Sequence, residues 1–449
     1  MSVHNALRNI YHFLPLRLRL GREFWRLYDF YDKMQHLPYE KRREFQMQEL
    51  CRVITHAYEH TRYYRRLFDE YGIRPSQIQD FSDIKKIPIL TKDIVREHLM
   101  DMISDVNSPK NLIYVTTGGS TGKPLGLYIT PKSEKKRMVF TWLNWSFMGY
   151  RPGMSCVVLR GNVVKNNWFR YDRGDNYLVL STYELSEANM EKYLKKMEEF
   201  SPNFIRGYPS ALEILAKFII KNDITLNTSK KIGGIATSSE ALRPAQKQLI
   251  EKAFHCRVFD WYGNCEQVGA IGVCHQGYYH EFMEHSYLEY LDQNGRDTVS
   301  GEAEIVGTSF INDAVPFIRY RTGDVVRLSQ ETNCNCGLES RRIDRIIGRW
   351  HGDSIQTKAG NLISLTALNT HSDIFDHTIR IQYYQDTIGV VILKIIRCPE
   401  YTEEDTKKIY AELTQKLGDQ AELRIDFVEE IPLTERGKYK MLDQRLRLP

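Results

Sequence analysis

The feature that most limits the possible folds of this chain is a strand, a polar turn and a helix that recur through its middle. Short apolar segments typical of buried strands alternate with amphipathic segments typical of helices. The strands are predicted at 155–159, 178–181, 203–207, 231–236 and 256–259, and the helices at 133–150, 185–200, 211–221 and 244–254. Because parallel strands are joined by helical crossovers, the pattern predicts an α/β domain with a mostly parallel sheet flanked by helices.

Polar residues follow two neighbouring strands of this predicted sheet. Ser239 and Glu240 follow the strand at 231–236, and the segment Tyr262-Gly263-Asn264-Cys265-Glu266 follows the strand at 256–259. In open parallel sheets the carboxyl ends of the strands form the ligand crevice. These two polar segments are therefore predicted to face one site.

A loop rich in glycine and hydroxyl groups precedes the alternating region. It reads Thr116-Thr117-Gly118-Gly119-Ser120-Thr121-Gly122-Lys123-Pro124 and lies between two strand-like segments. Glycines allow a tight loop to aim backbone N–H groups inward, beside the hydroxyls and Lys123, which predicts a polyphosphate-binding loop. It is not the P-loop of kinases and GTPases, since Thr117 and Pro124 stand where that motif needs a glycine and a magnesium-binding Ser or Thr.

The chain divides into two predicted domains. Residues 1–348 form a large domain that is helical over residues 1–110, and residues 354–449 form a small α+β domain with strands at 379–384, 389–396 and 421–428 and a helix at 403–417. The segment 349–353 between them is predicted to be a hinge that pivots at Asp353.

Composition favours a soluble, cytoplasmic protein. The net charge of +5 over 449 residues is too small and too dispersed to favour nucleic acid, and no stretch has the length of a membrane span or the form of a cleaved signal. The arginine-rich segment 10–28 has two interpretations, peripheral contact with an anionic membrane and docking on the protein's own core, of which docking is favoured. The oligomeric state stays open.

Five motifs in this order resemble the adenylate-forming superfamily, and within it the phenylacetate-CoA ligase-like branch that includes the CapK proteins of capsular polysaccharide biosynthesis. They are the loop 116–124, the segment 262–266, Tyr320-Arg321-Thr322-Gly323-Asp324, Gly348-Arg349 and Gly437-Lys438. The resemblance implies a large ATP- and acid-binding domain and a small mobile one. It also implies a reaction in which a carboxylate attacks the α-phosphate of ATP, releases pyrophosphate and forms an acyl adenylate, with Mg²⁺ as cofactor.

The resemblance also implies a role for each matching residue. Glu266 would bind Mg²⁺, Asp324 would hold the ribose hydroxyls with Arg349 beside it, and Tyr262 would stack on adenine. Gly263 lies beside Tyr262, and Ser239 and Glu240 would line the opposite wall. Lys438 would bring a positive charge to the reacting groups when the small domain closes, so the expected catalytic residues are Lys438, Glu266 and Arg349.

Three cysteines and a histidine predict a second, structural site. Cys274, His280, Cys334 and Cys336 are soft or borderline ligands in two pairs, and tetrahedral Zn²⁺ accepts three thiolates and one imidazole. His275 competes with His280 as the nitrogen ligand. Four protein ligands leave no position open for catalysis.

The sequence leaves the substrates open. Trp142, Trp145, Phe204 and Tyr208 suggest an aromatic, small or sugar-linked acid, and the acceptor of the acyl group is the thiol of coenzyme A or an amine, such as that of an amino sugar or glycan. The alternative function is a nucleotide-binding scaffold of a polysaccharide assembly complex that has the fold without turnover.

Overall fold

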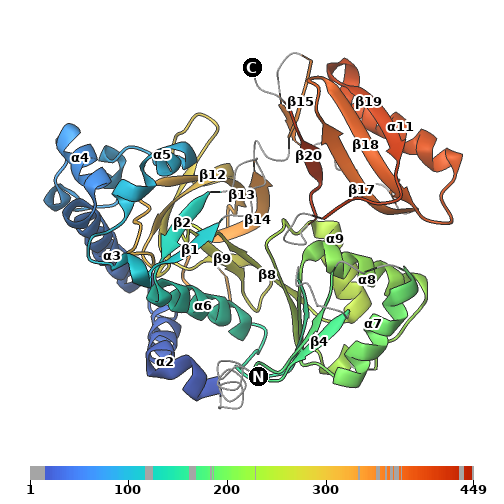
Figure 1. Cartoon of the computed structure of the whole chain (residues 1–449), viewed down its shortest axis with the longest axis horizontal. Helices are drawn as coiled ribbons and strands as arrows, with labels where there is room; N and C mark the ends of the chain where they lie inside the picture. The colour runs from blue at the N-terminus through green and yellow to red at the C-terminus, as the bar shows by residue number, and fades with distance from the viewer. Residues whose placement is uncertain are drawn as a thin grey trace. The chain divides into compact units, whose positions relative to one another are not determined.

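The computed structural model divides the chain into two compact units, residues 1–346 and 347–449 (Figure 1). The residues that it describes are 16–116, 125–160, 168–182, 185, 187–227, 229–331, 334–349, 354–358, 362–364, 368, 374–375, 377–433 and 439–446. Among them, no helix combines the length and the apolar composition that a bilayer crossing requires.

One sheet of twelve strands runs through the first unit, in the order β11-β12-β13-β14-β10-β9-β8-β7-β6-β3-β5-β4. Its strands are β3 (Cys156–Leu159), β4 (Phe169–Asp172), β5 (Tyr177–Leu180), β6 (Phe204–Gly207), β7 (Gly234–Ser238), β8 (Val258–Gly263), β9 (Ala270–Val273), β10 (Tyr279–Glu281), β11 (Ser286–Leu291), β12 (Gly301–Ser309), β13 (Tyr320–Leu328) and β14 (Arg342–Arg349). Strands β5, β3, β6, β7 and β8 pair in parallel, which confirms the α/β prediction.

The rest of this sheet is built differently from the expected repeat. Strand β4 pairs antiparallel with β5, and the pairings described among β8, β9, β10, β14, β11, β12 and β13 are antiparallel as well. Connections of a few residues join β8 to β9 and β9 to β10, too short for the crossover that parallel pairing needs. Strand β13 begins only at Tyr320, because the apolar residues before it, Val315, Phe317 and Ile318, pack into a helical core.

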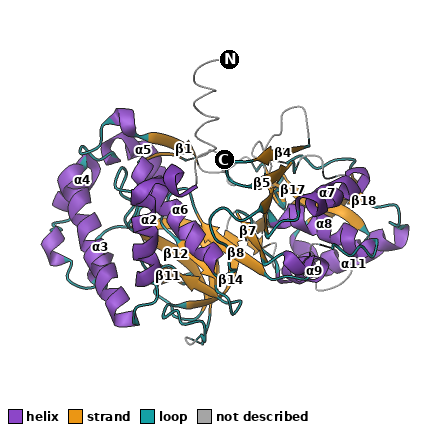
Figure 2. Cartoon of the chain, turned by 90° about the horizontal axis from the view of Figure 1, so that it is seen from below, coloured by secondary structure: helices purple, strands orange, loops and turns teal. Residues whose placement is uncertain are grey.

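Helices cover both faces of the parallel strands (Figure 2). Side chains alternate along each strand, so Val157 and Leu159 of β3 face one core while Cys156 and Val158 face the other. On the first face lie α7 (Glu187–Phe200), α8 (Pro209–Lys221) and α9 (Pro244–Phe254), grouped together in green in Figure 1. On the second lie α2 (Leu16–Met34) and α6 (Pro131–Ser146).

Helix α2 contains most of the arginine-rich segment 10–28, for which docking on the protein's own core was favoured over contact with a membrane. Phe24 is fully buried against the α6 core, and its ring meets Trp142 edge-on at 5.0 Å. The prediction that this segment docks on the protein's own core is confirmed for residues 16–28, while residues 10–15 lie outside the described residues. Trp142 of α6, expected to line an acid pocket, packs against Phe24 and Trp25 of α2 in this helix–helix contact.

The described residues before 111 are mainly helical, and those that follow α2 pack in a core that they share with later parts of the chain. They include α3 (Tyr39–His60), α4 (Arg62–Glu70) and α5 (Lys92–Met102), which pack with the hairpin of β1 (Ile113–Thr116) and β2 (Gly126–Ile129). The helical region expected over 1–110 is divided here, because Thr61 is extended and its hydroxyl caps α4 by accepting from the Tyr64 N–H. Short 3₁₀ turns lie at Pro75–Gln77, Asp83–Lys86, Pro109–Asn111, Ser229–Lys231 and Gly418–Gln420.

The second unit is a small α+β domain. Its main sheet has the order β19-β18-β17-β20, from β17 (Thr378–Gln385), β18 (Val390–Arg397), β19 (Glu422–Phe427) and β20 (Leu442–Gln444). Helix α11 (Glu403–Leu417) covers it through the buried side chains Ile409, Leu413 and Leu417. Strands β15 (Ser354–Gln356) and β16 (Leu362–Ser364) form a separate hairpin.

Candidate active site and candidate metal centre

The carboxyl ends of four parallel strands meet along one edge of the large sheet. Arg160 follows β3, Tyr208 follows β6, Ser239 follows β7, and Gly263 ends β8. Adjacent parallel strands run in register here, so these residues lie along the same edge. The two polar segments predicted to face one site therefore lie along one edge of the sheet.

Ser239 and Glu240 are held firmly at the end of β7. Ser239 has a φ of 74°, a left-handed conformation that is uncommon for a residue other than glycine and is often kept at functional sites. Its hydroxyl accepts a hydrogen bond of 3.0 Å from Nη2 of Arg160. The Glu240 carboxylate accepts from the N–H and the hydroxyl of Ser210, both at 3.0 Å. It thereby gives a partner to one of the backbone N–H groups that the first turn of α8 leaves unpaired.

Two contacts join the end of β8 to β13. The Tyr262 hydroxyl donates to Oδ2 of Asp324 at 2.8 Å, and the Tyr320 hydroxyl donates to Oε1 of Glu266 at 3.0 Å. Burial and the charge of Asp324 raise the pKa of the Tyr262 hydroxyl well above its ordinary value, so it remains a donor. The structure thus brings together three predicted site residues that are separated by up to 62 positions in the chain.

The structure describes only some of the other predicted nucleotide-binding residues. Thr116 ends β1 and pairs with Gly126 of β2, so the glycine-rich loop connects two antiparallel strands instead of opening a helix. Residues 117–124, including Thr117, Gly118, Gly119, Ser120, Thr121 and Lys123, lie outside the described residues, as do Asp353 and Lys438. Arg349 is the last residue of β14, and its side chain is not described.

Cys274, His280, Cys334 and Cys336 form a compact cluster whose ligand atoms all lie within 4.8 Å of one another. Cys274 follows β9, His280 lies in β10, and the other two cysteines lie between β13 and β14. The Sγ atoms of Cys274 and Cys334 are 3.9 Å apart, and Sγ of Cys336 is 3.5 Å from Nε2 of His280. Tetrahedral zinc with bonds of about 2.1 to 2.3 Å requires separations of about 3.5 to 3.8 Å, so this donor set fits the ion.

His280, and not His275, contributes the nitrogen atom of this cluster. The other ring nitrogen of His280, Nδ1, lies 3.3 Å from the Ser340 hydroxyl, a contact that orients the imidazole with Nε2 toward the sulfur atoms. His275 is absent from the cluster, and its carbonyl oxygen accepts from Nη1 of Arg257.

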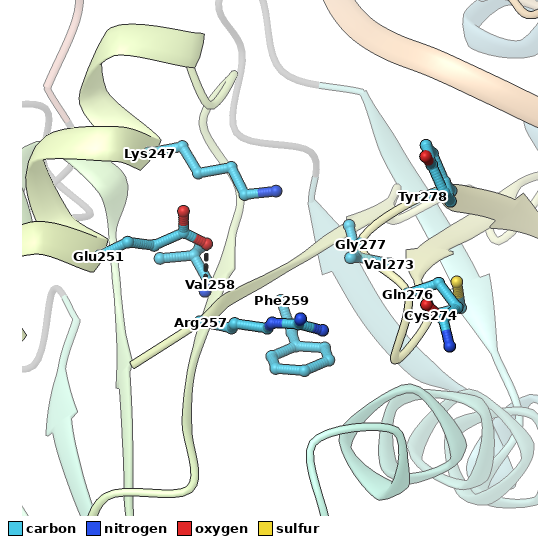
Figure 3. A pocket seen from close by; sticks show the side chains of 10 residues that line it. All are labelled: Lys247, Glu251, Arg257, Val258, Phe259, Val273, Cys274, Gln276, Gly277 and Tyr278. Carbon is cyan, nitrogen blue, oxygen red and sulfur yellow. Dashed lines mark hydrogen bonds between the residues drawn. The ribbon is translucent and has the colours of Figure 1, made fainter. Parts of the chain in front are cut away.

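The metal cluster lies away from the predicted nucleotide residues. Strand β9 runs antiparallel to β8, with Ala270 beside Gly263, so Cys274 lies near the amino end of β8 while Glu266 follows its carboxyl end. A cavity of about 290 Å³ beside the cluster is lined by Cys274 together with Lys247, Glu251 and Arg257 (Figure 3). The separation of the two sites favours a structural ion over a catalytic one.

A buried carboxyl group lies on β8 between these two sites. Asp260 accepts from the Thr237 hydroxyl at 2.6 Å and from the Tyr279 hydroxyl at 2.9 Å, and burial raises its pKa from 3.8 to about 6 despite these hydrogen bonds. The folded protein therefore keeps this proton up to about pH 6, whereas the unfolded chain releases it near pH 4. The contribution of Asp260 to stability is complete below about pH 4 and is lost as the pH rises to about 6.

This difference predicts how an Asp260→Asn variant behaves. We expect that acidification from pH 7 to pH 4 stabilises the wild-type protein relative to the variant by about 3 kcal/mol, because each pKa unit corresponds to about 1.4 kcal/mol. Urea unfolding of both proteins at the two pH values measures the effect. If the free energy of unfolding changed equally with pH in both proteins, this prediction would be wrong.

Two residues at the site had no predicted role. Tyr320 opens a motif used for the resemblance, but only its contact with Glu266 reveals its function as a donor. Arg160 directly follows a predicted strand, and the rule that ligands bind at the carboxyl ends of parallel strands would have singled it out.

Comparisons with known proteins agree with this fold. A family model described as the CapK C-terminal domain matches residues 355–444. Protein CapK of Staphylococcus aureus is 25% identical over 403 residues, which cover 88% of this chain and 87% of that protein. The phenylacetate-coenzyme A ligase of Thermus thermophilus is 27% identical over 328 residues, covering 71% and 72% of the two chains.

Solved structures share the fold. A 2-hydroxyisobutyryl-CoA ligase in its postadenylation state superposes with a TM-score of 0.69 at 18% identity, covering 92% of this chain and 91% of that one. An anthranilate CoA ligase in complex with anthranoyl-AMP gives a TM-score of 0.51 at 15% identity, with 80% and 74% coverage. These matches, beside the convergence of Tyr262, Glu266 and Asp324, make the chain similar over most of its length to Protein CapK and to the phenylacetate-coenzyme A ligases, and its residues 355–444 match the CapK C-terminal domain family.

Proposed function

We propose that this protein activates a carboxylic acid with ATP, forms an acyl adenylate with release of pyrophosphate, and transfers the acyl group to the thiol of coenzyme A. The observation that carries the proposal is the pair of contacts, Tyr262 to Asp324 and Tyr320 to Glu266, at the edge where parallel strands end. The names of the relatives, which include several phenylacetate-coenzyme A ligases, support the coenzyme A step.

The residues of the site suit charge neutralisation and positioning, which phosphoryl chemistry mainly requires. Asp324 would accept from the ribose hydroxyls, and Tyr262, which holds one of its oxygens, would fix its orientation beside adenine. Glu266 is mostly buried and offers a carboxylate to Mg²⁺, a cation commonly held by one or two carboxylates and by substrate phosphates. The bound ion would neutralise phosphate charge, and Lys438 would add a second positive charge.

We also infer that Cys274, His280, Cys334 and Cys336 hold a structural zinc ion. The ion would connect the β9–β10 turn to the segment between β13 and β14, two regions about 60 residues apart. Four protein ligands complete its tetrahedral shell, so it would have no role in the reaction.

Exchange of radiolabelled pyrophosphate into ATP over a panel of carboxylic acids tests the proposed function. We expect exchange with one chemical class of acids, and then AMP formation that depends on coenzyme A. AMP formation that instead depends on an amine, such as that of an amino sugar or glycan, would support the acceptor expected for a role in polysaccharide biosynthesis. Absence of exchange with every acid, while ATP still binds, would contradict the proposal and favour a scaffold.

Replacing Tyr320 by Phe tests the role assigned to Glu266. The change removes the hydroxyl that orients this carboxylate, and the loss of such a partner typically weakens metal binding by about 10-fold to 100-fold. We expect the Mg²⁺ concentration for half-maximal exchange to rise by about that factor. Tyr193→Phe is the matched control, since Tyr193 is also buried and donates to the Ser181 carbonyl at 2.9 Å away from the site. Equal magnesium dependence in both variants would reject the assignment.

A further inference from the structure

A half-buried arginine with no acidic partner among the described residues lies on the α6 face of the parallel sheet. Arg206 in β6 pairs with Val158 of β3 and with Ala236 of β7, and both neighbours belong to the core beneath α6. Its guanidinium lies 4.6 Å from the ring centre of Trp145, a residue of α6, and 5.4 Å from that of Tyr177.

The contacts of Arg206 leave its hydrogen-bonding capacity unused. Aromatic rings attract a guanidinium through its flat face, while its N–H groups point outward in the plane. Within the described ranges of the chain, no carboxylate pairs with Arg206 and no acceptor bonds to its five N–H donors. Two more deeply buried arginines differ, since Arg42 pairs with Glu284 at 2.6 Å and Arg319 with Glu289 at 2.8 Å.

A second arginine extends this positive region toward the strand ends. Arg160, two residues beyond Val158 and therefore on the same face of the sheet, is half-buried and lies 5.4 Å from the Tyr208 ring centre. Burial lowers the pKa of its guanidinium, and the nearby charges of Arg206 and Arg137 lower it further. The two arginines thus repel one another where water is partly excluded, an arrangement that a bound anion would relieve.

The positive region is continuous with the proposed nucleotide site. Arg160 reaches Ser239 at the end of β7, the strand beside β8, and Glu266 follows β8. An acid whose carboxylate reacts at that edge would direct the remainder of its structure toward Arg160 and Arg206. A group bound there would be a portion of the substrate that does not react.

We propose that Arg206, assisted by Arg160, binds a second anionic group of the activated acid, so that the substrate is a dicarboxylic or a phosphorylated carboxylic acid. This inference rests on the proposed function and specifies its substrate class. The aromatic rings hold the guanidinium in place, and its N–H groups are arranged to bind a carboxylate or a phosphate in bidentate fashion.

Matched pairs of acids that differ by one anionic group test the proposal directly. Binding of succinate and butyrate, of isophthalate and 3-methylbenzoate, and of 3-phosphoglycerate and glycerate is measured by calorimetry on the full-length protein with Mg²⁺ and a non-hydrolysable ATP analogue. We expect the wild-type protein to bind the dianionic member of at least one pair about 10-fold to 100-fold more tightly, the usual range for a hydrogen bond to a charged group. A preference for succinate or isophthalate would show that the second anionic group is a carboxylate, and a preference for 3-phosphoglycerate would show that it is a phosphate.

Variants of Arg206 assign this preference to its charge. We expect Arg206→Met to abolish the preference for the dianionic acid and to leave binding of the monoanionic acids and of the ATP analogue unchanged. Arg206→Lys should retain part of the preference. Arg206→Met should fold, because it removes a charge that no described acid compensates. Arg170→Met is the control, since Arg170 is exposed on β4 and pairs with Asp172.

Two results would overturn the inference. One is a wild-type protein that prefers no dianionic acid, and the other is an Arg206→Met variant that weakens both members of a pair equally. Both results are obtained without turnover, so they are distinct from failure of the proposed function, which appears as absence of pyrophosphate exchange in a protein that still discriminates between the acids.

Discussion

The purified full-length protein is expected to contain about one zinc ion per chain, and a Cys336→Ser variant is expected to lose the ion together with several kcal/mol of stability. The reason lies in the compactness of the cluster, whose ligand atoms lie within 4.8 Å of one another although they come from two separate regions of the chain. Without the ion, no metal bonds would join the three thiol groups and the imidazole, and the two regions of the chain would lose this connection. Metal analysis after purification without chelator and urea unfolding measure the two effects.

A matched control separates loss of zinc from loss of a thiol. Cys51 lies in α3, outside the cluster, and its thiol contacts only the Ile78 carbonyl among the hydrogen bonds described. We expect Cys51→Ser to retain zinc and to unfold at nearly the same urea concentration as the wild-type protein. A zinc content near zero in the wild-type protein, or equal stability of the Cys336→Ser variant, would reject the structural ion.

A Lys438→Ala variant is expected to lose pyrophosphate exchange by about 100-fold to 1,000-fold while it still binds ATP. Removing one group that stabilises developing charge in a transition state typically costs about 2.7 to 4 kcal/mol, and ground-state binding of the nucleotide depends on other residues. Exchange kinetics and calorimetry with ATP measure the two quantities on the same preparation.

Lys440 offers the control for this prediction. It lies two residues further along the chain and forms an ion pair of 3.2 Å with Asp443 inside the second unit. We expect Lys440→Ala to exchange pyrophosphate at the wild-type rate. If Lys438→Ala retained full exchange, the role that the resemblance implies for this lysine would be wrong.

Local signals in the sequence predicted several elements with their boundaries. Helix α9 begins at Pro244 and ends at Phe254 as expected, and α11 spans Glu403–Leu417 between the cap at Thr402 and the stop at Gly418. A proline in the first turn, a capping box and a terminal glycine act within a few residues, so the sequence alone reveals them. The apolar periodicity continues across Thr61, so the pattern does not indicate the break there, although the Thr61 hydroxyl caps α4 locally.

The antiparallel region of the large sheet was harder to predict. Strands β9 and β10 are only four and three residues long, and their pairing depends on partners such as β14, which lies some sixty residues further along the chain. Short strands of this kind gain their stability from neighbours and not from intrinsic preference. A single sequence therefore indicates the α/β class but not the extension of the sheet beyond β8.

The sequence by itself determined which residues could take part in the chemistry, because residue type and order limit what a side chain can bind. It singled out Glu266, Asp324 and the four cluster residues as candidates without any coordinates. Only the tertiary structure decided how they are combined: Tyr262 with Asp324, Tyr320 with Glu266, His280 instead of His275, and Arg206 between Trp145 and Tyr177. The physical reason is that such contacts join distant positions, and their geometry and burial follow from the packing of the whole sheet rather than from neighbouring residues.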